Sequence, residues 1–178
     1  FGNEVVRRQH ADFKDTLAQL PNEPFRAVYH LASDHAIADV RVHANLGQYD
    51  RRDLKGPFDV IGDVHGCRTE LDALLAGLGW KHALGVPHHP EGRMCVFVGD
   101  LVDRGPNTVD VLTLAMDMVQ SGVAACVVGN HDDKLMRAMQ GRKVEVGPSL
   151  AATLAQIYAM GSAFALRTRQ FLEALPSH

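Results

Sequence analysis

The sequence has few cysteines, no long apolar run and no excess of basic residues, and each shortage excludes a class of protein. Its three cysteines, Cys67, Cys95 and Cys126, lie far apart, a pattern that favours reduced thiols over a disulfide or zinc framework. No run approaches the about 18 apolar residues that indicate a membrane-spanning helix, and the amino terminus lacks the pattern of a secretion signal. We therefore expect a cytoplasmic protein without a membrane partner.

The charge balance is close to neutral, with 18 Lys and Arg against 21 Asp and Glu and a formal net charge of -3. Such a chain lacks the overall positive charge that favours binding along a nucleic acid backbone. Binding to the end of a strand is still compatible with this charge. Apolar residues make up 46% of the 178 positions, which is enough for a buried core. We expect a globular protein of one domain, or of one domain with part of another.

Three segments in order combine a short apolar strand with a turn that carries metal-ligand side chains. They are FDVIGDVHG at residues 58–66, CVFVGDLVDRG at 95–105 and ACVVGNHD at 125–132. The helices expected around them cover residues 69–79, with a Thr69–Asp72 capping box, 106–122, 134–139, a segment from 149, and 164–175. Strands alternating with helices predict an α/β fold with parallel pairing, whose functional groups collect at the carboxyl ends of the strands.

The first third of the chain carries weaker signals. Apolar residues at helical spacing predict an amphipathic helix over residues 4–20, and two short strands are expected at 25–31 and 40–43. Residues 46–57 are polar with Gly and Pro, and residues 81–92 carry Pro and Gly as well, so we expect a linker and an exposed loop there.

Four side chains in the three segments are candidate metal ligands. Asp63, His65, Asp100 and Asn130 supply the carboxylate, imidazole and amide donors that divalent cations accept. Asp63 and His65 are two residues apart, so in an extended segment they would point the same way and bind one ion. Asp100 is the natural bridge to a second ion, of which Asn130 would be a ligand. We expect two divalent ions, with manganese as first choice and nickel, iron or zinc as alternatives.

Three neighbouring residues are candidates for acting on a phosphate ester. Arg104 can fork onto phosphate oxygens, and His131 is placed to donate a proton to the leaving oxygen. Asp103 would orient the His131 imidazole, and Asn130 and His131 would join Arg104 in binding phosphate. The alternative for Asp103 and Arg104 is a surface salt bridge that contributes little to stability. Because two metals activate water for attack, no protein nucleophile is required.

Three motifs together resemble the signature of the binuclear metallophosphoesterases, the calcineurin-like phosphatase superfamily. They are GDVHG at 62–66, GDLVDRG at 99–105 and GNHD at 129–132. The resemblance implies an α/β sandwich of two sheets flanked by helices. It assigns metal ligation to Asp63, His65, Asp100 and Asn130, and phosphate binding and proton donation to Arg104 and His131.

A further resemblance covers nearly the whole chain. The runs YDRRDLKGPFDVIGDVHGC, FVGDLVDRGPNTVDVL, GNHDDKLMRAMQGR and FLEALPSH resemble the phosphatase module of bacterial polynucleotide kinase-phosphatases, enzymes of RNA end repair. It implies that residues 1–55 are the remnant of a preceding kinase-like domain with a linker, and that 56–178 are the amino-terminal part of the metallophosphoesterase domain. The kinase loop Gly-x-x-x-x-Gly-Lys-Ser/Thr is absent, so no kinase activity is expected.

The chain also departs from the superfamily pattern. The resemblance implies two more histidine ligands for the second metal, well downstream of GNHD, but His178 is the one histidine after His131. We therefore expect a second metal site that is incomplete and a domain truncated at its carboxyl end. The half-built sheet would expose apolar surface that a partner or the rest of the parent chain covers.

The leading functional prediction is a metal-dependent phosphoesterase that acts on RNA or DNA ends. Its substrate would be a 3′-phosphate or a 2′,3′-cyclic phosphate, hydrolysed by metal-activated water during end repair. The alternatives are a serine/threonine protein phosphatase, a dinucleoside polyphosphate hydrolase, and a fragment without turnover. GNHD in place of the GNHE common in protein phosphatases disfavours the first alternative.

Overall fold

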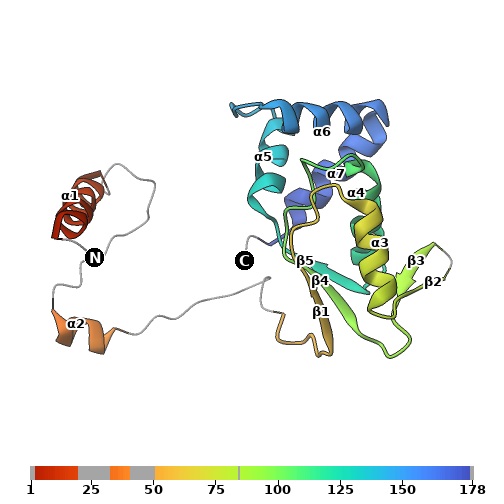
Figure 1. Cartoon of the computed structure of the whole chain (residues 1–178), viewed down its shortest axis with the longest axis horizontal. Coiled ribbons are helices and arrows are strands. Elements are labelled where there is room, and N and C mark those ends of the chain that lie inside the picture. Colours follow the sequence, from red (N-terminus) through yellow and green to blue (C-terminus); the bar gives the residue numbers. More distant parts are fainter. Residues whose placement is uncertain (1–2, 20–32, 41–50, 84, 177–178) are drawn as a thin grey trace. The chain divides into compact units, whose positions relative to one another are not determined.

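The computed structural model describes residues 3–19, 33–40, 51–83 and 85–176. The chain divides into two compact units, Phe1–Asn45 and Leu46–His178. The first contains α1 (Asn3–Gln19) and α2 (Asp34–Asp39), and the second contains all other elements (Figure 1). The assignment of residues 1–55 to a kinase remnant stays a prediction. No helix among the described residues is long and apolar enough to cross a membrane.

The first unit confirms one predicted element and adds another. α1 matches the helix expected over residues 4–20, but Val6 and Phe13 of its apolar stripe are 55% and 59% exposed. α2 was not expected, and its N-cap Ser33 accepts a hydrogen bond from the Ala36 backbone N–H at 3.2 Å. The strands predicted at 25–31 and 40–43 lie outside the described residues, apart from Val40.

A three-stranded parallel sheet organises the second unit. Its strands are β1 (Phe58–Ile61), β4 (Met94–Phe97) and β5 (Ala124–Cys126), in the order β1-β4-β5. α3 (Arg68–Gly77) follows β1, and α4 (Thr108–Gln120) connects β4 to β5. The predicted α/β class and parallel pairing are confirmed, and the turns after the three strands therefore meet at one edge of the sheet.

Several element boundaries differ from the predicted ones. The capping box expected between Thr69 and Asp72 is wrong, because the Asp72 carboxylate accepts from Arg68 Nε at 2.9 Å. The loop expected at 81–92 contains an antiparallel hairpin of β2 (Lys81–Ala83) and β3 (Val86–His88).

The remaining helices lie after β5. They are α5 (Asn130–Met139), α6 (Pro148–Ala159) and α7 (Ser162–Ala174). Figure 1 shows α5 and α6 at one end of this unit and the β2–β3 hairpin at the other. α5 begins at Asn130 rather than at residue 134, so the last predicted metal ligand is the first residue of a helix.

The core lies on one face of the sheet. Alternation along β1 and β4 buries Ile61, Cys95 and Phe97. They pack in one cluster with helix residues that include Leu75, Leu112, Met118, Leu135, Ile157 and Leu172. All three cysteines are free, and burial raises the pKa of the Cys95 thiol to about 12, so this thiol stays protonated at neutral pH.

The other face of the sheet is apolar and exposed. Val60 and Val98 are 68% and 43% exposed. A groove of about 670 Å³ on this face is lined by residues that include Met94, Val96 and Phe171. Exposed apolar surface on the sheet was expected, and the described residues do not cover it.

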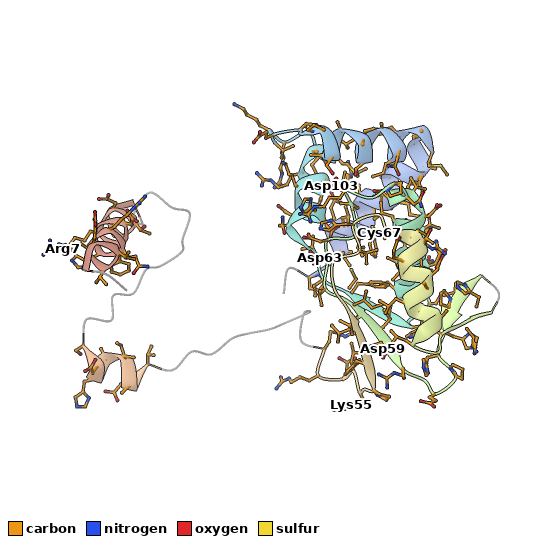
Figure 2. All side chains as sticks on the ribbon, in the orientation of Figure 1. Arg7, Lys55, Asp59, Asp63, Cys67 and Asp103 are labelled. Carbon is orange, nitrogen blue, oxygen red and sulfur yellow. The ribbon has the colours of Figure 1, made fainter. Side chains whose placement is uncertain are left out.

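One charged group is buried on the core side of β1. Asp59 is 7% exposed and accepts hydrogen bonds from Trp80 Nε1 at 2.9 Å and Arg93 Nε at 2.8 Å. The Arg93 hydrogen bond is the main cause that holds the pKa of Asp59 below its usual value. Figure 2 shows Asp59 well away from Asp103, at the hairpin end of the unit, so this network stabilises the fold rather than the candidate site.

Replacing Asp59 with asparagine is expected to lower Tm at neutral pH, because the charged hydrogen bonds to Arg93 are lost. A depressed pKa contributes stability above the unfolded-state pKa, and this contribution is lost as pH falls through the folded-state pKa. The Tm difference between wild type and Asp59→Asn should therefore shrink below about pH 4. Thermal unfolding across the acid range checks this, with Glu145→Gln at an exposed site as control. A difference that is constant with pH contradicts the account.

Candidate functional site

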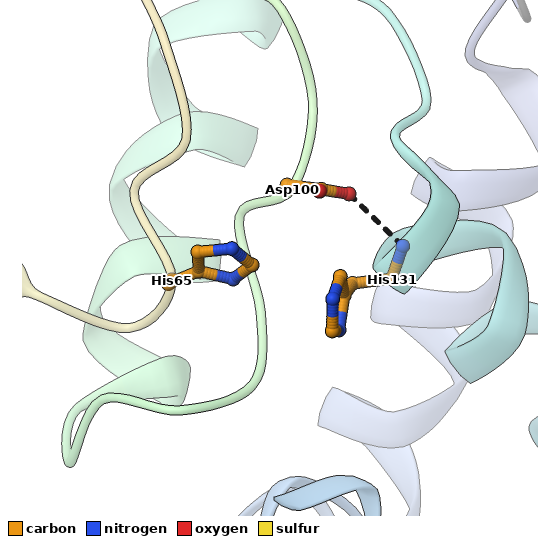
Figure 3. A group of neighbouring side chains, drawn as sticks. All are labelled: His65, Asp100 and His131. Atoms are coloured by element: carbon orange, nitrogen blue, oxygen red, sulfur yellow. Dashed lines mark hydrogen bonds between the residues drawn. The ribbon is translucent and has the colours of Figure 1, made fainter. Parts of the chain in front are cut away.

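The turns after β1, β4 and β5 bring together three of the side chains that the sequence analysis singled out. Donor atoms of His65, Asp100 and His131 all lie within 4.8 Å of one another. Figure 3 shows these three side chains converging from three separate segments of the chain. The cluster holds two of the four predicted metal ligands, His65 and Asp100, together with His131, which was predicted as the proton donor.

The backbones of these turns are joined directly. The Asp100 carbonyl accepts from the His65 N–H at 2.9 Å, and the His65 carbonyl accepts from the Gly105 N–H at 2.7 Å. A Cβ atom on Gly105 would collide with the His65 carbonyl, and one on Gly129 would collide with Asp100. These glycines are therefore required by close backbone contact between turns.

The site also concentrates backbone strain. In the described part of the chain, the non-glycine residues with positive φ are His65 (47°), Asp100 (51°), Asp103 (70°) and Arg104 (66°). Such conformations cost about 1–3 kcal/mol each and persist where the surroundings enforce them. The extended conformation predicted across Asp63 and His65 is wrong, because His65 adopts the left-handed region.

His65 has the geometry of a metal ligand. Its Nδ1 lies 2.8 Å from the Val102 carbonyl oxygen, and because a carbonyl can only accept, Nδ1 carries the proton. Its Nε2 is buried without a hydrogen-bond partner in the described residues, and Asp63 Oδ2 lies 3.5 Å away. A ring nitrogen bonded to a carbonyl, with the other nitrogen left as a lone-pair donor, is the usual arrangement of a metal-binding histidine.

The other predicted ligands differ in how exposed they are and in which partners they have. Asp100 Oδ1 accepts from the His131 backbone N–H at 2.9 Å (Figure 3), which leaves Oδ2 for another partner. The Asp63 side chain is 63% exposed, and Asn130 is exposed at the start of α5. The Asp63 and Asp100 carboxylates near the unpaired buried Nε2 of His65 fit a divalent cation.

His131 connects Asp103 to Arg104. His131 Nδ1 lies 2.8 Å from Asp103 Oδ2, and Arg104 Nη2 lies 3.4 Å from His131 Nε2. Asp103 is 3% exposed, so it is not half of a surface salt bridge with Arg104. The Asp103 carboxylate holds the imidazole with Nε2 toward the Arg104 guanidinium, and contact between Asp103 and the His131 ring was predicted.

Asp132 is a site residue that the sequence analysis missed. Its buried carboxylate accepts from the Leu101 N–H and the Gly129 N–H, both at 3.0 Å. Burial raises the pKa of this carboxyl, while the two backbone hydrogen bonds oppose the shift. Asp132 thus ties the turn after β4 to the turn after β5. An aspartate three residues after a glycine N-cap is a recognisable helix-start signal, and it could have been found.

Replacing Asp132 with alanine is expected to lower the free energy of unfolding by about 2–4 kcal/mol, because two backbone N–H groups lose their acceptor. Urea unfolding measures this. Asp133→Ala, which removes a partly exposed carboxylate with a 3.7 Å contact to Arg137, is the control and should change stability by less than about 1 kcal/mol. Equal effects of the two substitutions would contradict the assignment.

Comparison with known proteins places these turns in a family. Residues 56–163 match the calcineurin-like phosphoesterases. The asymmetrical bis(5′-nucleosyl)-tetraphosphatase PrpE of Halalkalibacterium halodurans is 48% identical over 103 residues, which are 58% of this chain and 42% of that protein. PrpE of Bacillus subtilis is 42% identical over 100 residues, 56% of this chain and 41% of that protein.

The relatives correct one part of the sequence analysis. They are named as tetraphosphatases, not as the polynucleotide kinase-phosphatases that the longer sequence runs resemble. They favour the dinucleoside polyphosphate alternative over nucleic-acid end repair. The chain spans about two fifths of the length of these relatives, 42% and 41%. The family match itself covers more than half of this chain and contains all three turns. The chain therefore belongs to the calcineurin-like phosphoesterase family.

Proposed function

We propose that this protein is a metal-dependent hydrolase of dinucleoside polyphosphates, with bis(5′-nucleosyl) tetraphosphates as the first candidates. The observation that carries the phosphoesterase activity is the cluster of His65, Asp100 and His131 donor atoms within 4.8 Å, with Arg104 beside His131. The substrate class is supported by the tetraphosphatase relatives. Hydrolysis of RNA or DNA ends is the competing candidate, and the experiment below compares the two activities directly.

The metal ligands in this proposal are Asp63, His65, Asp100 and Asn130. His65 offers the unpaired Nε2, and Asp100 offers the oxygen that the His131 N–H does not use. Divalent ions bound there would polarise a phosphoryl oxygen and lower the pKa of a water molecule. The incomplete second metal site and manganese as the native ion stay predictions.

Arg104 and His131 would act on the substrate itself. The Arg104 guanidinium can bind phosphate oxygens in a bidentate manner and offset charge that develops in the transition state. His131 Nε2 would donate a proton to the bridging oxygen that leaves with the departing nucleotide. The Asp103 carboxylate at Nδ1 stabilises the positive charge of the imidazolium before the proton is given up.

A substrate competition tests this proposal. The full-length protein with Mn²⁺ is assayed on diadenosine tetraphosphate, on RNA oligonucleotides ending in a 3′-phosphate or a 2′,3′-cyclic phosphate, and on a phosphopeptide. We expect kcat/KM for the tetraphosphate to exceed the others by at least about tenfold, with one nucleoside triphosphate and one monophosphate as products. Preference for an oligonucleotide end would overturn the proposal and favour end repair. Asp100→Asn protein serves as the control for contaminating hydrolases.

A further inference from the structure

Helix α6 presents polar side chains to the turn that carries Asp103 and Arg104. Ser149, Thr153 and Gln156 are spaced by four and three residues, so they share one face of the helix. Thr153 Oγ1 donates to Asp103 Oδ1 at 2.7 Å, Ser149 Oγ accepts from the Arg104 N–H at 2.7 Å, and Gln156 Oε1 accepts from the Thr108 N–H at 3.1 Å. α6 is thus bonded to the turn at Asp103 and Arg104, and to the first residue of α4 at Thr108.

The contact between Thr153 and Asp103 is the most enclosed of these. Thr153 is 1% exposed and Asp103 is 3% exposed, and a buried hydroxyl that donates to a carboxylate makes a strong, charge-assisted hydrogen bond. Asp103 uses one carboxylate oxygen for Thr153 and the other for His131 Nδ1. The orientation of the His131 ring therefore depends on the Asp103 carboxylate, whose other oxygen is hydrogen-bonded by Thr153 of α6.

The backbone of the same turn needs support. Asp103 and Arg104 are consecutive non-glycine residues with φ of 70° and 66°, a conformation that persists only where surrounding contacts enforce it. Thr153 bonds the side chain of the first residue, and Ser149 bonds the N–H of the second. Both strained residues are therefore anchored on α6.

We propose that α6 positions the catalytic turn, with Thr153 as the principal positioning residue. Thr153 acts through Asp103 on the orientation of His131, and Ser149 acts through the backbone of Arg104 on phosphate binding. This inference rests on the proposed phosphoester hydrolysis, with His131 as proton donor, but not on the identity of the nucleotide substrate. It also gives a role to helix residues that lie 45 to 50 positions beyond the turn in sequence.

The test compares Thr153→Val, which removes the hydroxyl, with Thr153→Ser, which keeps it, in the full-length protein with Mn²⁺. Phenyl phosphate and 4-nitrophenyl phosphate are the substrates, because only the first has a poor leaving group that needs a proton. We expect Thr153→Val to lower kcat on phenyl phosphate by about tenfold or more and on 4-nitrophenyl phosphate by less. Thr153→Ser should stay within about threefold of wild type on both.

A matched control separates positioning from a general loss of packing. Thr168 on α7 is also fully buried, and its hydroxyl has no hydrogen-bond partner among the described residues. Thr168→Val should leave kcat and KM on both substrates unchanged. Wild-type kinetics in Thr153→Val, or a loss that Thr153→Ser shares, would overturn the proposal.

Ser149→Ala keeps the inference testable if Thr153→Val does not fold, because Ser149 is less buried. We expect this variant to raise KM for both aryl phosphates by about threefold or more, while Ser162→Ala at an exposed position of α7 has no effect. An unchanged KM in Ser149→Ala would overturn the role of α6. The same variants are assayed on diadenosine tetraphosphate. If wild type does not cleave that nucleotide but the aryl phosphates show the expected pattern, the nucleotide substrate is wrong and the role of α6 stands.

Discussion

Replacing Asp100 with asparagine is expected to lower both kcat and Mn²⁺ affinity by at least about 100-fold. This loss exceeds the one expected for a residue that only hydrogen-bonds to a metal ligand. Asparagine is close in shape and keeps one oxygen to accept from the His131 N–H, which lies 2.9 Å from Asp100 Oδ1. It removes the negative charge and one of the two carboxylate oxygens that would hold divalent cations. The substitution therefore tests the metal role of Asp100 and leaves the hydrogen bond in place.

Steady-state kinetics and calorimetric titration with Mn²⁺ measure the two effects of Asp100→Asn. Asp110→Asn, at an exposed position in the first turn of α4, is the matched control and should match wild type in both. A variant that keeps kcat within about tenfold of wild type at saturating Mn²⁺ would show that Asp100 does not bridge the ions.

Replacing His131 with alanine is expected to lower kcat by about 10²–10⁴-fold on substrates with poor leaving groups. The imidazole Nδ1 is held by Asp103 at 2.8 Å and Nε2 lies 3.4 Å from Arg104 Nη2, so Nε2 faces the side where Arg104 would bind phosphate. An activated leaving group needs little protonation, and the loss on 4-nitrophenyl phosphate should therefore be much smaller than on phenyl phosphate.

The alternatives for His131 give different results in the same experiment. Equal losses on the two aryl phosphates would make His131 a phosphate-binding residue rather than a proton donor. A fall in Mn²⁺ affinity would make it a metal ligand, which its ring position near His65, with centroids 4.8 Å apart, allows. His88→Ala, at an exposed position at the end of β3, should affect none of these quantities.

The meeting of the three turns could be predicted from the sequence because each turn follows a short, largely apolar strand segment. These segments place β1, β4 and β5, parallel pairing aligns their carboxyl ends, and the residues after those ends must then meet. The local backbone conformation within the turns was harder to predict from the sequence. His65 was expected in an extended segment, but the turn is joined to the backbone of Asp100 and adopts a left-handed conformation at φ 47°.

The supporting residues were harder to predict because their partners are distant in sequence. Thr153 lies in an apolar helix and reads as a core position, and its contact with Asp103 depends on how α6 packs against the rest of the unit. Asp132 was visible as part of the GNHD motif, but its two backbone donors come from different turns. Tertiary packing, rather than local pattern, assigns such residues their roles.

The central claim is that the three turns form a divalent metal centre, and His65 tests it most directly because its buried Nε2 has no hydrogen-bond partner in the described residues. The measurement is calorimetric titration of Mn²⁺ into wild-type protein, His65→Ala and the exposed control His88→Ala. We predict that His65→Ala weakens binding by at least about 100-fold while His88→Ala binds like wild type. Equal Mn²⁺ affinity in wild type and His65→Ala would contradict the account.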